Sequence, residues 1–267
     1  MRGSLVATGI VLGVLAASVE AKEIVTVPVA DGVTVSYLLA VPDGGAQAVA
    51  LLFPGSYGKT DLPAIAGRLR LARGNFLVRA REQFVSRGVA TAVVDTPSDQ
   101  PDGMSDEFRL GARHAKDVAA VVADVRKRVG DGPAFLVGTS RGSISAASGG
   151  ARLGDTVGGV VLTSSMYRST TPRSTEPGPG LSRFDFASLK VPVLLVHHRN
   201  DGCPVSPYVE AHLLSKRFPL VAVSGGSPPE SQPCQAMSAH GYLGREAETV
   251  DAIVNWMLRK PYRREID

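Results

Sequence analysis

Apolar and β-branched runs alternate along this chain with stretches in which apolar residues recur every three or four positions. Such runs predict buried strands, and such spacing predicts amphipathic helices. Strands are expected at residues 23–30, 33–41, 48–53, 89–94, 134–138, 157–163, 191–197 and 220–223. Helices are expected at residues 76–87, 108–129, 143–153, 207–217 and 245–259. The alternation predicts an α/β fold with a mostly parallel central sheet and helices on both of its faces.

The first two expected strands are separated only by Asp31-Gly32, which predicts an opening β-hairpin. Three segments break the later alternation, at residues 55–75, 97–106 and 164–184, and each follows an expected strand. Ligands bind at the carboxyl edge of open α/β sheets. These segments are therefore candidate walls or lids of a pocket, and plain surface loops are the alternative.

The amino terminus has the features of an export signal. Arg2 is followed by an apolar run over residues 5–17, and Val19-Glu20-Ala21 offers a small-residue cleavage site. The run is shorter than the roughly 20 residues of a membrane span, although an uncleaved anchor is an alternative. We expect residues 1–21 to be a signal peptide, and the mature protein to be periplasmic or secreted without stable membrane insertion.

Composition bounds the remainder of the chain. The chain has 267 residues, of which 44% are hydrophobic and 20% charged, so residues 22–267 are expected to form one domain. The formal net charge of +4 is only mildly basic and does not indicate a nucleic-acid partner. Nothing in the composition indicates an oligomeric state.

An exported chain changes what its two cysteines imply, because disulfides persist in oxidising compartments. We expect Cys203 and Cys234 to be bonded to each other. Two unpaired thiols are the alternative, since the sequence does not show whether the Cα atoms come within about 7 Å.

The motif Gly138-Thr139-Ser140-Arg141-Gly142 fits the G-x-S-x-G pattern of a nucleophile elbow. It follows the expected strand "AFLVG" and precedes a helix of small residues. Ser140 is therefore a candidate nucleophile, and a serine in an ordinary strand-to-helix turn is the alternative.

A serine nucleophile needs a base to remove its proton and a carboxylate to orient that base. Asp201 follows the strand expected at 191–197, and His240 lies between the last strand and the last helix. Their order matches the Ser, acid, His order of α/β-hydrolases. Asp95 and Asp185 are weaker candidates for the acid.

With these motifs in this order, the chain resembles the α/β-hydrolase superfamily, in particular its dienelactone-hydrolase-like and serine-esterase branch. The resemblance covers nearly all of the mature chain. It implies a Ser140 nucleophile, a His240 general base and an Asp201 orienting acid.

The resemblance also implies an oxyanion hole. One backbone N–H would come from Arg141, and a second from Ser56 or Tyr57 after the third strand. The family often has His-Gly where this chain has Pro54-Gly55. A bond between the cysteines would then tie the acid loop to the base loop.

Other polar residues have competing interpretations. His197 and His198 are more plausible as pocket-lining residues than as metal ligands, because no further ligand lies at a suitable spacing. His114 and His212 lie in helical patterns and are expected to be solvated or capping. The Arg141 side chain would bind a substrate anion or pair with a carboxylate. The basic residues Arg68, Arg70, Arg73, Arg79 and Arg81 are either an anion site or solvated helix faces.

The sequence therefore predicts an exported serine hydrolase without cofactor or metal, acting on a small-molecule ester or amide through an acyl-enzyme. A carboxylic ester is the expected substrate. A peptidase or amidase, and a non-catalytic binding protein of the same fold, are the alternatives. A lipase is disfavoured, because residues 164–184 are too polar for an apolar lid.

Overall fold

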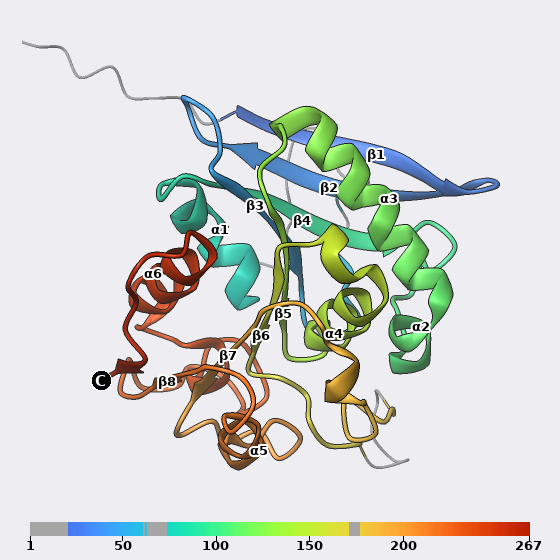
Figure 1. The fold of residues 1–267 in the computed structure, drawn as a ribbon. Helices are drawn as coiled ribbons and strands as arrows, with labels where there is room; N and C mark the ends of the chain where they lie inside the picture. The colour runs from blue at the N-terminus through green and yellow to red at the C-terminus, as the bar shows by residue number, and fades with distance from the viewer. Residues whose placement is uncertain (1–20, 61, 63–73, 171–176) are drawn as a thin grey trace, which may run out of the picture.

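A computed structural model describes residues 21–60, 62, 74–170 and 177–267 (Figure 1). The described strands form one nine-stranded sheet in the order β1-β2-β4-β3-β5-β6-β7-β8-β9. Their bounds are β1 Ala21–Ala30, β2 Val33–Val41, β3 Ala48–Phe53, β4 Val89–Pro97, β5 Ala134–Thr139, β6 Gly159–Thr163, β7 Val193–His198, β8 Leu220–Val223 and β9 Glu265–Ile266. The expected signal peptide lies outside the described residues, except that Ala21 begins β1.

The sheet is antiparallel only at its start. β1 and β2 form the expected hairpin, in which Gly32 takes a φ of +67° that suits glycine in a tight turn. β2 also pairs antiparallel with β4, and from there to β9 all neighbouring strands are parallel. The mostly parallel sheet with an opening hairpin is confirmed.

Helices cover both faces of the sheet. They are α1 Phe76–Val85, α2 Asp106–Leu110, α3 Ala112–Val129, α4 Gly142–Leu153, α5 Tyr208–Leu214 and α6 Glu246–Met257. α1 and α6 pack on one face and α3 and α4 on the other, as Figure 1 shows. Each face has its own apolar core, and the strands contribute alternate side chains to the two cores.

Two elements differ from the prediction in more than their bounds. The helix expected at 108–129 is divided into α2 and α3, because Gly111 adopts an extended conformation with φ −73° and ψ 155°. Its N–H closes α2 on the Phe108 carbonyl, and the same residue begins α3. The two-residue strand β9 was not predicted, because its pairing with β8 rather than its own apolar pattern defines it.

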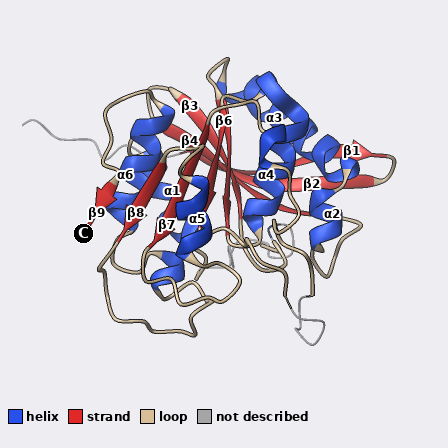
Figure 2. Cartoon of the chain, turned by 60° about the horizontal axis from the view of Figure 1, so that its bottom comes forward, coloured by secondary structure: helices blue, strands red, loops and turns tan. Residues whose placement is uncertain are grey.

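The parallel strands β3, β5, β7 and β8 end at the same edge of the sheet. Figure 2 shows the long loops of the molecule gathered along one end of the sheet. Residues that are far apart in sequence therefore meet there. Within the part of the chain that the structure describes, no helix is long and apolar enough to span a bilayer.

Candidate active site

Ser140 stands in a sharp turn between β5 and α4, with a φ of +52°. The two glycines of its motif allow main-chain segments to approach each other. A Cβ on Gly138 would lie 2.3 Å from the Gly142 carbonyl oxygen, and a Cβ on Gly142 would lie 2.0 Å from that of Phe53. Any side chain at either position would force these segments apart, so the turn depends on both glycines.

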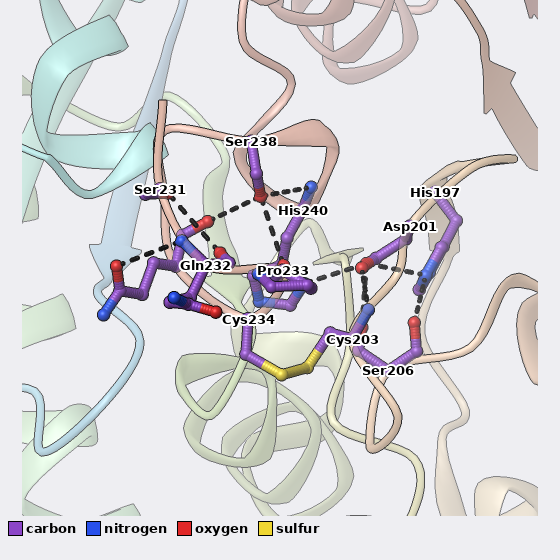
Figure 3. Close-up of a disulfide and its surroundings, with 11 residues drawn as sticks. His197, Asp201, Cys203, Ser206, Ser231, Gln232, Pro233, Cys234, Ser238 and His240 are labelled. Carbon is purple, nitrogen blue, oxygen red and sulfur yellow. Dashed lines mark hydrogen bonds and ion pairs between the residues drawn. A yellow bond between two sulfur atoms is a disulfide. The ribbon is translucent and has the colours of Figure 1, made fainter. Parts of the chain in front are cut away.

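His240 and Asp201 are joined by a hydrogen bond (Figure 3). His240 Nδ1 donates to Asp201 Oδ2 over 2.8 Å, from a 3₁₀ turn at Ala239–Gly241 to the loop that follows β7. With its proton on Nδ1, the neutral ring carries a lone pair on Nε2. His240 Nε2 is buried and has no hydrogen-bond partner among the described residues. The ring is therefore oriented as a base with its accepting nitrogen unused.

The Asp201 carboxylate receives donors on both oxygens. Oδ1 accepts the Cys203 N–H over 2.9 Å, and Oδ2 also accepts the Ser206 hydroxyl over 3.3 Å. Burial alone would raise the pKa of Asp201, but the hydrogen bonds from His197 and His240 outweigh it and hold the pKa well below its usual range. The carboxylate is therefore ionised at neutral pH, as an orienting acid must be.

His197 and His198 do not line the cavity beside Ser140, so that prediction was wrong. His197 is fully buried, and its Nε2 donates to the Ser206 carbonyl over 2.9 Å while lying 3.3 Å from Asp201 Oδ2. His198 Nε2 donates to the Gly225 carbonyl, and burial lowers the pKa of this ring. Among the described residues, no group of three or more His, Cys, Asp or Glu side chains could hold a metal ion.

The two alternative acids have other partners. Asp95 accepts the backbone N–H groups of Thr60, Leu62 and Thr96, so it supports the loop that follows β3. Asp185 is exposed and caps the short turn at Phe186–Ser188 through the Ala187 N–H. The carboxylate that binds His240 is that of Asp201.

Ser140 and His240 line the same cavity, which has a volume of about 940 Å³. Two of the three irregular segments border the cavity. Ser56 and Tyr57 line it from the segment at 55–75, and Met166 and Thr170 line it from the segment at 164–184. Of the described residues at 97–106, none lines it. Arg68, Arg70 and Arg73 lie outside the described residues.

The loop after β3 passes close to Ser140. A Cβ on Gly55 would lie 3.0 Å from the Ser140 Cβ, so the Pro54-Gly55 backbone runs beside the candidate nucleophile. Ser56 has a φ of +51°, and the Gly58 N–H donates to the Gly55 carbonyl over 3.1 Å to close a tight turn. Arg141 directly follows Ser140 at the start of α4. The three candidate oxyanion residues thus border the cavity.

The side chain of Arg141 pairs with a carboxylate. It is 4% exposed, and its Nη1 lies 3.4 Å from Asp106 Oδ1. Burial raises the pKa of Asp106, against the opposing effects of the Gly180 N–H and of Arg141. Of the two interpretations of this arginine, the structure favours structural pairing.

The cysteines form the expected disulfide, with Cα atoms 4.5 Å apart. It joins the loop after β7 to the loop that precedes His240, as Figure 3 shows. Within the second loop, Ser238 Oγ donates to the Gln235 carbonyl over 2.8 Å and accepts the His240 N–H over 3.2 Å. Both loops are therefore anchored close to Asp201 and His240.

Tyr242 anchors the loop that carries His240 to the sheet, and this role was not predicted. It is fully buried with a φ of +58°, and its hydroxyl donates to the Val196 carbonyl and accepts the Ser164 N–H. Arg79 donates to the Gly241 carbonyl and pairs with Glu246 over 2.8 Å, so it is neither an anion site nor simply solvated. The sequence pointed to this loop through the place of His240 between the last strand and the last helix.

The expectation of a solvated or capping role was wrong for His114. The ring is 3% exposed and lies between Phe53 and Phe108, with no hydrogen-bond partner for either nitrogen among the described residues. Burial, followed by the nearby Arg109 and Arg113, lowers the pKa of His114 to about 3. His212 is exposed on α5, as expected.

Known proteins were compared with the chain by sequence and by structure. No family model matches the chain, and the comparison with curated proteins gives no match. Among solved structures, dienelactone hydrolase from Anabaena variabilis matches with a TM-score of 0.62 at 16% identity, over 90% of this chain and 98% of that one.

Two further structures match similarly. Est1E from Butyrivibrio proteoclasticus has a TM-score of 0.59 at 16% identity, over 88% of this chain and 98% of its own. XC6422 from Xanthomonas campestris, described as a serine hydrolase without a lid, has a TM-score of 0.58 at 15% identity, over 90% of this chain and 97% of its own. The chain therefore has a dienelactone-hydrolase-like α/β-hydrolase fold.

Proposed function

We propose that this protein is a serine hydrolase that cleaves small carboxylic esters through an acyl-enzyme on Ser140. One observation carries the proposal. His240 donates from Nδ1 to Asp201, its buried Nε2 has no hydrogen-bond partner among the residues that the structure describes, and the ring lines the same cavity as Ser140. Acyl transfer needs a base that is oriented by a carboxylate and has a nitrogen available for the serine hydroxyl, and His240 fits that need.

In the first half of the reaction, His240 Nε2 takes the hydroxyl proton as Ser140 Oγ attacks the ester carbonyl. The resulting imidazolium is stabilised by the Asp201 carboxylate 2.8 Å from Nδ1. The ring then gives the proton to the leaving alcohol, and the acyl group stays on Ser140. In the second half a water molecule takes the place of the alcohol, and the same proton transfers release the acid.

The tetrahedral intermediates carry negative charge on the former carbonyl oxygen. In the proposal, the Arg141 N–H at the start of α4 and an N–H of the Ser56-Tyr57 loop donate to that oxygen. Such donors are fixed before the reaction begins, and losing one typically lowers kcat by about 10² to 10³-fold.

The neighbours support a small substrate. One Est1E structure is described with bound ferulic acid, and another neighbour, DcsB, with a substrate analogue. A cavity of about 940 Å³ is large enough for an ester of that size. The disulfide fits export to an oxidising compartment. We therefore include a cleaved leader at 1–21 and a single hydrolase domain at 22–267 in the proposal.

The test uses purified mature protein, a fluorophosphonate probe and p-nitrophenyl esters of short acids. We expect labelling and turnover in the wild type, and neither in Ser140→Ala or His240→Ala. His212→Ala is the matched control, because His212 is exposed on α5, and should behave as the wild type. A folded wild type that neither labels nor turns over would show a non-catalytic binding protein. Faster turnover of matched anilides than of esters would favour the amidase alternative.

A further inference from the structure

Arg109 is a fully buried arginine that the mechanism above does not use. It lies on α2, is 0% exposed, and is among the largest side chains that the fold buries completely. Burying a guanidinium is costly unless its donors are satisfied. The partners of Arg109 therefore indicate what the buried side chain does.

The guanidinium joins the Ser56-Tyr57 loop after β3, called the oxyanion loop below, to α4, the helix that begins two residues after Ser140. Nη2 donates to the Ser56 carbonyl over 3.0 Å, and Nη1 donates to Ser145 Oγ on α4 over 2.9 Å. The loop packs directly on it, since a Cβ on Gly58 would lie 2.6 Å from Nη2. Next to this contact, the Met104 N–H donates to the Tyr57 carbonyl over 2.9 Å.

Ser56 needs such support because its φ of +51° is disfavoured for a residue with a side chain. A residue in this region persists only when its surroundings hold it there. A hydrogen bond to the Ser56 carbonyl fixes the orientation of the Ser56–Tyr57 peptide, because the peptide unit is planar. The position of the Tyr57 N–H then follows from where Arg109 holds that carbonyl.

We propose that Arg109 is the positioning residue of the oxyanion hole: it clamps the Ser56 carbonyl and ties the loop to α4, whose N-cap residue Arg141 supplies the other N–H. The inference rests on the proposed function. Arg109 does not touch the substrate. It sets the spacing between the two donors, and its loss moves one donor away from the developing charge.

The main variants are Arg109→Lys and Arg109→Met. In both we expect kcat for p-nitrophenyl esters to fall by about 10 to 100-fold, while KM changes by less than about threefold, because the loop donor acts mainly in the transition state. The affinity for an arylboronic acid, which places a negative oxygen in the hole, should fall in parallel with kcat. Binding of the product acid should not change.

Ser148→Ala is the matched control for lost packing. Ser148 also links α4 to the α2 region, through its hydroxyl and the Leu110 carbonyl, but it does not touch the oxyanion loop. Its kcat should match the wild type. If Ser148→Ala and Arg109→Lys lose kcat equally at equal thermal stability, Arg109 is only structural.

Rescue separates positioning from general damage. Glycine adopts a positive φ without strain, so Ser56→Gly added to Arg109→Lys should recover several-fold of the lost kcat. If Arg109→Lys only damaged the fold, Ser56→Gly would not restore kcat. Gly58→Ala disturbs the contact between the loop and Arg109 from the loop side. Its kinetics test the proposal even if the Arg109 variants do not fold. We expect it also to lower kcat with little change in KM.

The results distinguish two failures. An active wild type whose folded Arg109 variants and Gly58→Ala keep full kcat and full boronic acid affinity overturns the positioning role and leaves the hydrolase intact. A wild type without turnover on any ester overturns the proposed function itself, and with it the inference.

Discussion

Residues outside the three candidate catalytic side chains hold the candidate site together. Tyr242 lies two positions after His240, and its hydroxyl bridges the Val196 carbonyl and the Ser164 N–H at distances of 2.8 and 2.9 Å. Burial raises the pKa of Tyr242, so the hydroxyl stays protonated and can donate. The same two backbone groups also bond each other over 3.0 Å. Removing the hydroxyl therefore loosens the loop without leaving either group unpaired.

We expect Tyr242→Phe to lose about 1 kcal/mol of stability, the net value of a typical hydrogen bond. kcat should fall about tenfold or less, because the His240 loop loses its anchor. Tyr37→Phe is the control, since its hydroxyl donates to Asp124 on α3 over 2.5 Å, away from the cavity. Denaturant unfolding and ester kinetics on both variants make the comparison. Equal kcat in the two would mean that Tyr242 does not position His240.

His114 gives a prediction about pH. Its folded pKa of about 3 lies below that of the unfolded chain, near 6.5, so the unfolded state binds the extra proton between these values. Stability therefore falls as pH drops below about 6.5. His114→Leu removes this effect. The free energy of unfolding of the variant, relative to the wild type, should therefore be about 2 kcal/mol higher at pH 5 than at pH 8.

Denaturant unfolding at the two pH values measures this difference. His212→Leu, on the exposed face of α5, is the control and should leave the pH dependence unchanged. A His114→Leu variant whose stability follows the wild type at both pH values would contradict the buried neutral ring.

The sequence indicated the candidate catalytic residues but not what supports them. Ser140, Asp201 and His240 could be predicted because each follows a strand in the order that the fold imposes. Arg109 and His197 could not, since a basic or polar residue on a helix or at a strand end gives no sign of complete burial. Their burial comes from tertiary contacts, such as those of Arg109 with Ser56 and Ser145.

At the scale of elements, the site depends on two loops that follow neighbouring strands. β7 and β8 pair in parallel, so the loops that follow them start at one edge, and the Cys203–Cys234 disulfide links them. Cys203 also donates its N–H to Asp201. The linkage therefore bears on both stability and geometry.

We expect the double variant Cys203→Ser with Cys234→Ser to lose about 3 kcal/mol of stability, from the greater freedom of the unfolded chain. kcat should also fall, because the acid and base loops are no longer joined. Thermal unfolding and ester kinetics test this. Dithiothreitol should lower the stability and kcat of the wild type and leave those of the double variant unchanged. Full activity and full stability in the variant would make the link incidental.

Element boundaries could be predicted where the chain carries its own pattern. β2, β3 and β8 have the predicted bounds, because β3 and β8 are compact apolar runs and β2 lies between Asp31-Gly32 and Pro42. The separation of α2 from α3 could not be predicted, since a single glycine in a helical pattern is often tolerated. The break bears on the candidate site, because it lets the short α2 point Asp106 at Arg141 and Arg109 at the Ser56 carbonyl.

At the scale of the whole molecule, one sheet is shared by two apolar cores. The only tryptophan, Trp256, lies on α6 and packs on Phe135 of β5 at 5.7 Å between ring centroids. Its fluorescence therefore reports on one face of the sheet. The helical circular dichroism signal reports on both faces.

We expect the two signals to follow a single coincident transition in urea, because neither core can persist without the sheet. Cys203→Ser with Cys234→Ser should move both midpoints together. Separate midpoints would show that α6 and its face unfold as an independent unit, against one domain at 22–267.

The donors around Asp201 have a consequence for where the reaction keeps its proton. Oδ1 is occupied by the Cys203 N–H, and Oδ2 by His240 and the Ser206 hydroxyl, with His197 close by. A carboxylate surrounded by donors has little basicity left, so in the proposed mechanism the proton taken from Ser140 stays on His240. In that mechanism the centre stores one proton on one ring, and the carboxylate keeps its negative charge throughout the cycle.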